Sequence, residues 1–275
     1  MRKGVIYLIP VPIGNLGDIT LRALETLRMV SLIACEDTRR TRFLLSRYEI
    51  PVPKLISFHK FNERSREQSL FAHLDAGDDL AVVSDAGSPA ISDPAQALVD
   101  SATRAGYRVE ALPGATALIP AISISGFDSS SFQFLGFLPA KAKDRQRIIE
   151  SLKSYPHPSI IYESVHRLRA TLAELAKALA PRRIAIAREI SKLHEECIRG
   201  EISEVAANED LVLKGEFVIV IDKAEQKKLS FPDEAAFEII SQTSDQKSKD
   251  LAAILAQKYA ISKKEAYDFV VENKE

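Results

Sequence analysis

Short apolar runs of strand length alternate with helical patterns along residues 5–222, and this alternation constrains the fold more than any other feature. Most of these runs are apolar along nearly their whole length, which is typical of strands buried on both faces of a parallel sheet. Strands that alternate with helices predict an α/β protein, with a parallel or mostly parallel sheet in residues 1–113. In the first half of the chain the runs are VIYLIPV (5–11), SLIAC (31–35), LAVVS (80–84) and YRVEAL (107–112).

A second group of strand-like runs begins after Pro113-Gly114, at 132–138, 158–164, 182–189 and 215–222. A polar stretch follows, and the remainder of the chain shows only helical patterning, enough for about three short helices. We therefore expect two α/β domains, a linker and a small helical domain, over residues 1–113, 114–223, 224–234 and 235–275.

Two helix starts are marked by capping signals. Thr20 precedes a helical pattern over 20–30 in which Leu21, Leu24 and Leu27 are spaced for one face. Asp93 is placed to cap the helix that follows the third strand, with Pro94 at its first position.

Charge and cysteine content exclude several classes of protein. Lys and Arg number 37 against 38 Asp and Glu, so any nucleic-acid contact must come from a local basic patch. Cys35 and Cys197 form no CxxC pair, which argues against a disulfide scaffold and a cysteine-based zinc site. No run approaches the ~20 apolar residues of a membrane span. We expect a cytoplasmic protein.

Four turns after strands combine glycine, proline and polar side chains. Glycines allow close backbone approach to a ligand, and a carboxylate beside such a backbone suits ribose hydroxyls and an amino group. The third turn holds about 11 residues between strand and helix, which is long for an α/β unit and favours a binding loop. Ordinary turns remain the alternative for each segment. The four are PVPIGNLGDIT (10–20), ACEDTRRTR (34–42), VVSDAGSPAISDPA (82–95) and LPGATAL (112–118).

In this order, the motifs strongly resemble the bacterial ribosomal RNA small subunit methyltransferase I family. This family lies within the tetrapyrrole-methylase fold, the class III S-adenosylmethionine methyltransferases. The resemblance covers residues 5–222 and includes IACEDTRRTRFLL, IYES-HRL, REISKLHEE and KGEFVIVI. Val165 stands where the family usually has proline, and Ala95 where it usually has glycine. Both lie at helix starts, which tolerate the change.

The resemblance implies 2′-O-methylation of a cytidine in the decoding region of 16S ribosomal RNA, by a homodimer whose cofactor cleft lies between the two α/β domains. The small ribosomal subunit is the implied partner, and no metal is needed. The cofactor contacts carried over from the family's motifs are Pro12, Asp85, Ala86, Gly87, Ser88, Thr116, Ala117, Tyr162, Glu163 and Glu216.

A ribose hydroxyl is a poor nucleophile while protonated, so a general base should touch it. Glu36 and Asp37 follow a strand's carboxyl end, where open α/β sheets bind ligands, and are the candidate catalytic residues. Residues 39–66 carry eight Lys and Arg against two acidic residues, which predicts a phosphate-binding face. The candidate RNA-binding residues are Arg39, Arg40, Arg42, His59, Lys60, Asn62, Arg64 and Arg66.

Other interpretations stay open. A methyltransferase of the same fold that acts on a tetrapyrrole carbon would also use arginines, and a non-catalytic ribosome-associated RNA-binding protein would share the basic segment. A second basic stretch contains Lys141, Lys143, Arg145 and Arg147 and is a further candidate RNA contact. His194 lies beside Glu195, Glu196 and Cys197, but adjacent side chains cannot all point one way, which argues against a metal site.

Overall fold

The computed structural model describes residues 2–59, 62–91, 95–225, 231–232, 234–242, 247–259 and 261–274. The chain forms two compact units, residues 1–224 and 225–275. The capping signal at Asp93 and Pro94 lies outside the described residues.

The first sheet of the larger unit is wholly parallel, with the strand order β3-β2-β4-β1-β5. The parallel sheet expected from the apolar runs is confirmed. Its strands are β1 (Val5–Leu8), β2 (Leu32–Cys35), β3 (Lys54–Ser57), β4 (Leu80–Val83) and β5 (Arg108–Ala111), and its helices are η1 (Leu16–Asp18), α1 (Leu21–Met29), α2 (Thr38–Arg47), α3 (Glu63–Asp75) and α4 (Ala95–Arg104).

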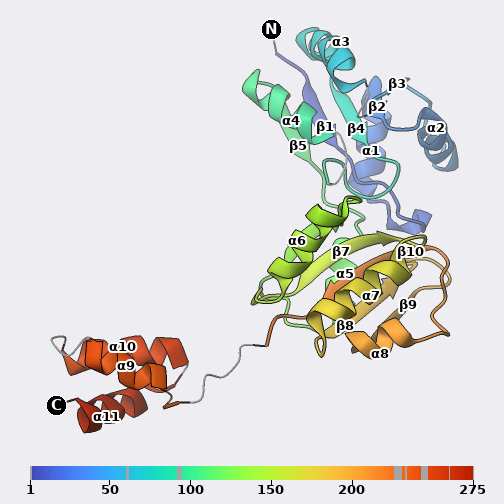
Figure 1. Ribbon diagram of the computed structural model, residues 1–275. Coiled ribbons are helices and arrows are strands. Elements are labelled where there is room, and N and C mark those ends of the chain that lie inside the picture. The colour runs from blue at the N-terminus through green and yellow to red at the C-terminus, as the bar shows by residue number, and fades with distance from the viewer. Residues whose placement is uncertain are drawn as a thin grey trace. The chain divides into compact units, whose positions relative to one another are not determined.

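Helices cover both faces of this sheet, which explains why its three inner strands, β1, β2 and β4, are apolar throughout (Figure 1). Leu80 and Val82 of β4 pack with α3 and α4, whereas Ala81 and Val83 pack with α1 and α2. Successive side chains of a strand point to opposite faces, so each face receives every second residue.

The structure confirms the predicted N-cap of α1 but only part of its predicted apolar face. Thr20 caps the helix, since its side chain accepts a hydrogen bond from the Ala23 N–H at 3.1 Å. Leu27 is buried, but Leu21 is 79% exposed, so the expected Leu21, Leu24 and Leu27 face is wrong at Leu21. The helix instead buries Ala23 and Leu27, which are four residues apart and so lie on one face.

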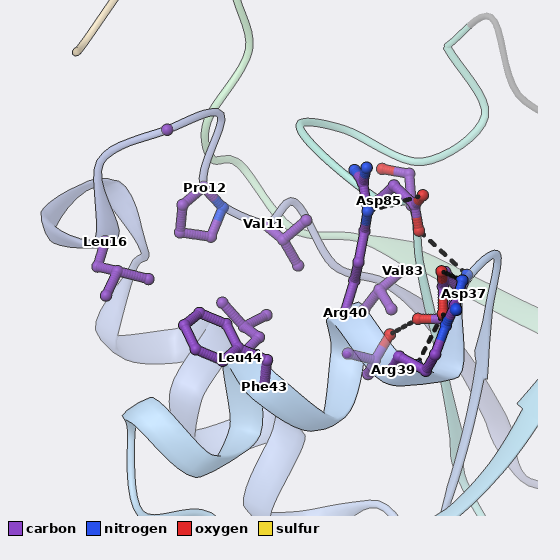
Figure 2. A pocket seen from close by; sticks show the side chains of 13 residues that line it. Val11, Pro12, Leu16, Asp37, Arg39, Arg40, Phe43, Leu44, Val83 and Asp85 are labelled. Atoms are coloured by element: carbon purple, nitrogen blue, oxygen red, sulfur yellow. Dashed lines mark hydrogen bonds and ion pairs between the residues drawn. The ribbon is translucent and has the colours of Figure 1, made fainter.

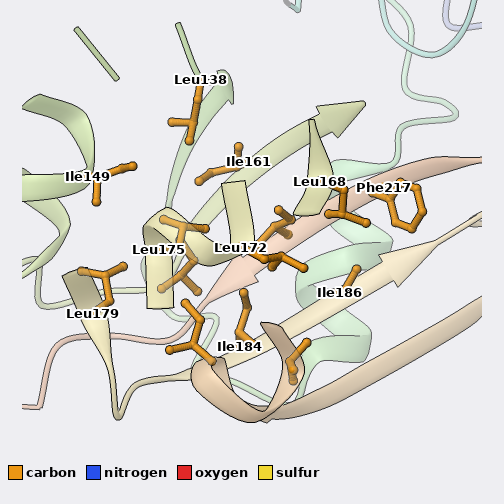
Figure 3. Close-up of a cluster of buried hydrophobic side chains, with 14 of the residues drawn as sticks. Leu138, Ile149, Ile161, Leu168, Leu172, Leu175, Leu179, Ile184, Ile186 and Phe217 are labelled. Carbon is orange, nitrogen blue, oxygen red and sulfur yellow. The ribbon is translucent and has the colours of Figure 1, made fainter. Parts of the chain in front are cut away.

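The second sheet is mixed, with the order β6-β7-β10-β8-β9, in which only β6 and β7 pair in parallel. One face packs on α6, α7 and α8 around a cluster that includes Leu172, Ile161 and Ile186 (Figure 3). The elements are α5 (Leu118–Ser125), β6 (Gln133–Phe137), α6 (Ala142–Leu152), β7 (Ser159–Ser164), α7 (Leu168–Leu179), β8 (Arg183–Arg188), β9 (Glu196–Glu201), α8 (Ile202–Ala207) and β10 (Glu216–Ile221).

The smaller unit is helical, as the sequence pattern indicates. Its helices are α9 (Glu234–Gln242), α10 (Ser248–Tyr259) and α11 (Lys263–Asn273). They bury their own apolar cluster, in which Phe231 packs against Tyr259 and Phe269 with ring centroids 5.1 and 4.8 Å apart. This unit therefore has a core independent of the two sheets.

Candidate active site

The loops at the carboxyl edge of the first sheet contact one another. Val11 and Gly87 form an antiparallel bridge, in which each backbone N–H donates to the other residue's carbonyl at 2.9 Å. Ser88 Oγ donates to the Ala115 carbonyl at 3.1 Å. Parallel strands bring their carboxyl ends to one edge, and the three segments at 10–20, 82–91 and 112–118 therefore meet there.

Asp85 connects this loop cluster to the segment at 34–42. Its Oδ1 accepts the Asp37 N–H at 3.0 Å, and its Oδ2 lies 3.6 Å from Arg40 Nε. The side chain is 28% exposed, so it is accessible to a ligand while held on two sides. Asp85 is thus the residue at which the second and third motifs join.

A pocket of about 500 Å³, here called the central pocket, is lined by residues of both sheets. Its acidic lining residues include Glu36 and Asp85, whereas Ile13, Ile190 and other apolar residues form much of the remaining wall. All the candidate cofactor contacts except Pro12 line it, namely Asp85, Ala86, Gly87, Ser88, Thr116, Ala117, Tyr162, Glu163 and Glu216.

Tyr162 on β7 contributes an aromatic wall to the central pocket. Its ring centroid lies 4.8 Å from that of Phe134 and 5.8 Å from that of Phe137, both in edge-on geometry. Burial raises the pKa of the Tyr162 phenol, and hydrogen bonds with Thr116 and the Leu118 backbone act in the opposite direction. The side chain therefore remains a neutral hydroxyl at neutral pH.

The neighbouring Glu163 is fully buried, and its carboxylate is already hydrogen-bonded within the protein. Oε2 accepts from Thr171 Oγ1 at 2.7 Å, and Oε1 accepts from the Ser164 N–H at 2.8 Å. Arg167 Nε lies 3.5 Å from Oε1. A buried carboxylate needs such partners, so Glu163 joins β7 to α7 while it lines the pocket.

Glu216 takes part in a network that the sequence did not reveal. Lys192 Nζ donates to Glu189 Oε1 at 2.8 Å and to Glu216 Oε2 at 2.9 Å. The hydrogen bond from Lys192 lowers the pKa of Glu189. The i,i+3 spacing of Glu189 and Lys192 could have indicated their ion pair from the sequence. The second partner of Lys192, Glu216, lies 24 residues further along the chain, and no local spacing indicates that contact.

The same segment contacts the first loop of the N-terminal half. Ser191 Oγ donates to the Asp18 carboxylate. A Cβ on Gly14 would lie 2.4 Å from the Lys192 side chain, so the loop backbone passes directly over that lysine. These contacts join residues 13–18 to residues 189–192 beside the central pocket.

A second pocket of about 710 Å³, here called the lateral pocket, lies on the first sheet's side (Figure 2). Figure 2 shows Pro12 and Leu16 on one side of it and Asp85 and Arg40 on the other. Ser84 and Asp85 line both pockets. The complete lining of the lateral pocket is Val11, Pro12, Gly14, Leu16, Asp37, Arg39, Arg40, Thr41, Phe43, Leu44, Val83, Ser84 and Asp85.

The two candidate catalytic carboxylates lie in different surroundings. Glu36 lines the central pocket, whereas Asp37 lines the lateral pocket. Asp37 is the N-cap of α2, and its carboxylate accepts from the Arg39 N–H at 2.8 Å and from Arg39 Nη2 at 2.7 Å. The Arg39 hydrogen bonds hold the pKa of Asp37 well below its ordinary value, which makes it a weak base.

The candidate RNA-binding residues are spread along the first sheet's side. Arg39 and Arg40 line the lateral pocket, and Arg42 is exposed on the same helix. Arg66 lines a separate pocket of about 340 Å³ with Lys54 and other residues. Lys60 and the side chain of Arg64 lie outside the described residues.

Other candidates are engaged in the protein's own structure. The Asn62 side chain accepts from the His59 N–H at 2.8 Å and donates to the Ser57 carbonyl at 3.0 Å, which shapes the turn after β3. In the second basic stretch, Arg145 donates two hydrogen bonds to Glu174, each of 2.7 Å. Such paired hydrogen bonds hold an arginine firmly in place.

Within the described ranges, no group of three or more His, Cys, Asp and Glu side chains is arranged to hold a metal ion. Over the same part of the chain, no helix has the length and apolar character needed to cross a membrane.

The family model of the Tetrapyrrole (Corrin/Porphyrin) Methylases matches residues 5–206. The chain is 46% identical over 234 residues to "Ribosomal RNA small subunit methyltransferase I" of Synechocystis sp., covering 84% of each chain. It is 37% identical to the protein of that name from Escherichia coli O157:H7, over 98% of this chain and 96% of the relative.

Solved structures agree on the fold. The uroporphyrin-III-C-methyltransferase of Thermus thermophilus matches 80% of this chain and 95% of its own with a TM-score of 0.56 at 17% identity. A cobalt precorrin-4 methyltransferase matches 79% of this chain and 94% of its own with a TM-score of 0.58 at 14% identity. The tetrapyrrole-methylase fold expected from the motifs is confirmed. The chain belongs to the tetrapyrrole (corrin/porphyrin) methylase family and, within it, to the ribosomal RNA small subunit methyltransferase I group.

Proposed function

We propose that the protein transfers a methyl group from S-adenosylmethionine to the ribose 2′-hydroxyl of a cytidine in the decoding region of 16S ribosomal RNA. The observation that carries this proposal is the pair of adjoining pockets that share Ser84 and Asp85. Transfer between two ligands requires two neighbouring sites, because the reacting atoms must approach to about 3 Å. The name shared by relatives at 37–46% identity supports ribosomal RNA as the acceptor.

The central pocket fits a nucleoside-containing cofactor. Gly87 adopts φ +76°, a conformation that favours glycine, and a Cβ there would lie 3.4 Å from the Ile13 side chain. Carboxylates suit ribose hydroxyls and an amino group, and the apolar walls suit a base. The residues that would hold the cofactor are Asp85, Ala86, Gly87, Ser88, Thr116, Ala117, Tyr162, Glu163 and Glu216, with Pro12 at the adjoining pocket.

When bound, S-adenosylmethionine supplies a methyl group on a sulfonium, which is already an activated leaving group. The protein's own residues then have to position the acceptor hydroxyl and accept its proton. Of the two candidate carboxylates, Glu36 lines the central pocket, whereas Asp37 is engaged by Arg39. We therefore assign proton acceptance to Glu36 and the positioning of α2 and Arg39 to Asp37.

The basic residues supply the contacts to RNA phosphates in this proposal. Arg39, Arg40, Arg42 and Arg66 are exposed or line pockets on the first sheet's side, where a polyanion can reach them. We further propose that the protein acts as a homodimer in the cytoplasm, with the small ribosomal subunit as its partner.

Two measurements on the same preparations test the proposal. Calorimetry with S-adenosylhomocysteine should detect one site per chain, and Asp85→Ala should abolish measurable binding, because hydrogen-bond donors of the ligand lose their acceptor. Transfer of radiolabelled methyl groups to small ribosomal subunits should then occur with the wild type and not with the variant. Absence of binding by the wild type, or transfer to a porphyrinoid and not to subunits, would overturn the proposed function.

A further inference from the structure

The lateral pocket exposes large apolar side chains beside the central pocket. Phe43 is 61% exposed and Leu16 is 37% exposed, although both are residues that folding normally buries. Together with Pro12 and Leu44 they line the pocket. An apolar surface inside a concave site with a few polar groups indicates a ligand that covers it.

The lateral pocket shares Ser84 and Asp85 with the central pocket. A ligand held in the lateral pocket therefore lies next to a ligand held in the central pocket. If the central pocket holds the methyl donor, the occupant of the lateral pocket is the methyl acceptor. This step rests on the proposed function.

The charges around the lateral pocket favour a polyanion. Helix α2 contains four arginines and no acidic residue. The side chains of Arg39 and Arg40 are 89% and 67% exposed, and within the pocket they balance Asp37 and Asp85. Arg42 and Arg47 add positive charge beside it, and Arg47 lies 5.5 Å from the centroid of the Phe43 ring. Exposed arginines on one helix suit phosphates, which accept hydrogen bonds from several guanidinium edges.

Arg39 remains able to donate to a ligand. It binds Asp37 through Nε and Nη2, at 3.1 and 2.7 Å. A guanidinium carries five N–H donors, so the edge that includes Nη1 is not used in this pair.

We propose that the lateral pocket receives the target nucleotide of the RNA, with its base stacked on the ring of Phe43 and its phosphates bound by Arg39 and Arg40. Stacking on an aromatic side chain is the usual way in which proteins hold an unpaired RNA base. The nucleotide therefore enters unpaired, and its ribose faces the wall formed by Ser84 and Asp85. A flat macrocycle with carboxylate groups could also stack on the ring and bind the arginines. The experiment therefore distinguishes RNA from such a macrocycle.

The experiment uses three full-length variants. Phe43→Ala removes the ring, Phe43→Tyr keeps it, and Met29→Ala is the matched control because Met29 is 58% exposed on α1 and lines none of the described pockets. Steady-state methylation of small ribosomal subunits from a strain that lacks the enzyme gives kcat and KM. Calorimetry with S-adenosylhomocysteine checks that each variant folds and keeps the central pocket.

We expect kcat/KM for subunits to fall about 5- to 150-fold in Phe43→Ala, the range that corresponds to the loss of one stacking ring. Phe43→Tyr and Met29→Ala should stay within about 2-fold of the wild type, and all three variants should bind S-adenosylhomocysteine normally. If Phe43→Ala methylates subunits as well as Met29→Ala does, or if it loses S-adenosylhomocysteine binding, the nucleotide site is wrong. A wild type that methylates no subunits overturns the proposed function itself, and a porphyrinoid substrate that depends on Phe43 overturns both.

Discussion

The Asp85 carboxylate accepts a hydrogen bond from the backbone N–H of Asp37, with an Oδ1–N distance of 3.0 Å. This bond ties the loop after β4 to the start of α2, although the two residues are 48 positions apart in the sequence. Asp85 also lines both pockets, so one side chain fixes the beginning of α2 and forms part of the wall that the two pockets share.

Substitutions at Asp85 should separate its structural role from its charge. Asp85→Ala leaves the partly buried Asp37 N–H without its acceptor and should lower the free energy of unfolding by about 1 kcal/mol. Asp85→Asn keeps an acceptor oxygen and should lower it by less. Urea unfolding curves measure both values. Equal losses for the two variants would show that the hydrogen bond does not stabilise α2.

Glu36 and Asp37 should give different kinetic defects. Glu36→Gln should lower the single-turnover methylation rate by about 10²- to 10⁴-fold at saturating cofactor, because an amide cannot accept the proton. Asp37→Asn should have a smaller effect, because asparagine is also a good helix N-cap. Affinity for S-adenosylhomocysteine should stay near the wild-type value in Asp37→Asn. A larger rate defect in Asp37→Asn than in Glu36→Gln would reverse the assignment.

The ion pair of Glu189 and Lys192 should make stability depend on pH in the acid range. Lys192 depresses the pKa of Glu189 in the folded state, so the folded protein binds fewer protons at this site than the unfolded chain. The resulting stabilisation is present above the unfolded pKa of about 4.3 and is lost as the pH falls through the lower folded value.

Thermal melting between about pH 6 and pH 3 checks this effect. Glu189→Gln should lower Tm at the upper end of this range and flatten the acid-side decline. Lys192→Met should flatten the decline in the same way, since it removes the partner that shifts the pKa. Unchanged pH dependence in both variants would contradict the predicted linkage.

Gly215 should be more sensitive to alanine than another glycine of similar conformation. Gly215 has φ +93°, and a Cβ there would lie 2.3 Å from Glu189 Oε1. Gly106 has φ +76°, but a Cβ there meets nothing within 4 Å. Gly106→Ala should cost about 1 kcal/mol from backbone strain alone, and Gly215→Ala should cost more because the Glu189 side chain must also move. Chemical denaturation of the two variants measures the difference, and equal losses would argue against the steric contact.

The sequence predicted most strands of both sheets, because buried strands are rich in apolar residues. It did not reveal β3 or β9, which lie at the edges of their sheets and lack such a run. The edge strand β9 reads ECIRGE and is only partly buried. The pattern of apolar residues reflects burial. A partly buried strand that contains polar residues therefore cannot be recognised from that pattern.

The motifs predicted that loops would meet at one edge of the sheet, because parallel strands place their carboxyl ends together. The sequence Glu36-Asp37 did not show which carboxylate caps α2 and which residue lines the central pocket, because that depends on the direction in which each side chain points. The contact of Lys192 with Glu216 also required the fold, because the two residues come from different elements. Residue types at strand ends predicted the location of the candidate site, but they did not predict which of its side chains form hydrogen bonds and ion pairs with one another.

The most direct test of the central claim is a map of 2′-O-methylation in 16S ribosomal RNA from a strain that lacks this protein. The account predicts that one cytidine of the decoding region loses its 2′-O-methyl group. The wild-type chain should restore that methylation in the deletion strain, and Asp85→Ala should not. An unchanged methylation map in the deletion strain, or restoration by Asp85→Ala as complete as that by the wild type, would contradict the account.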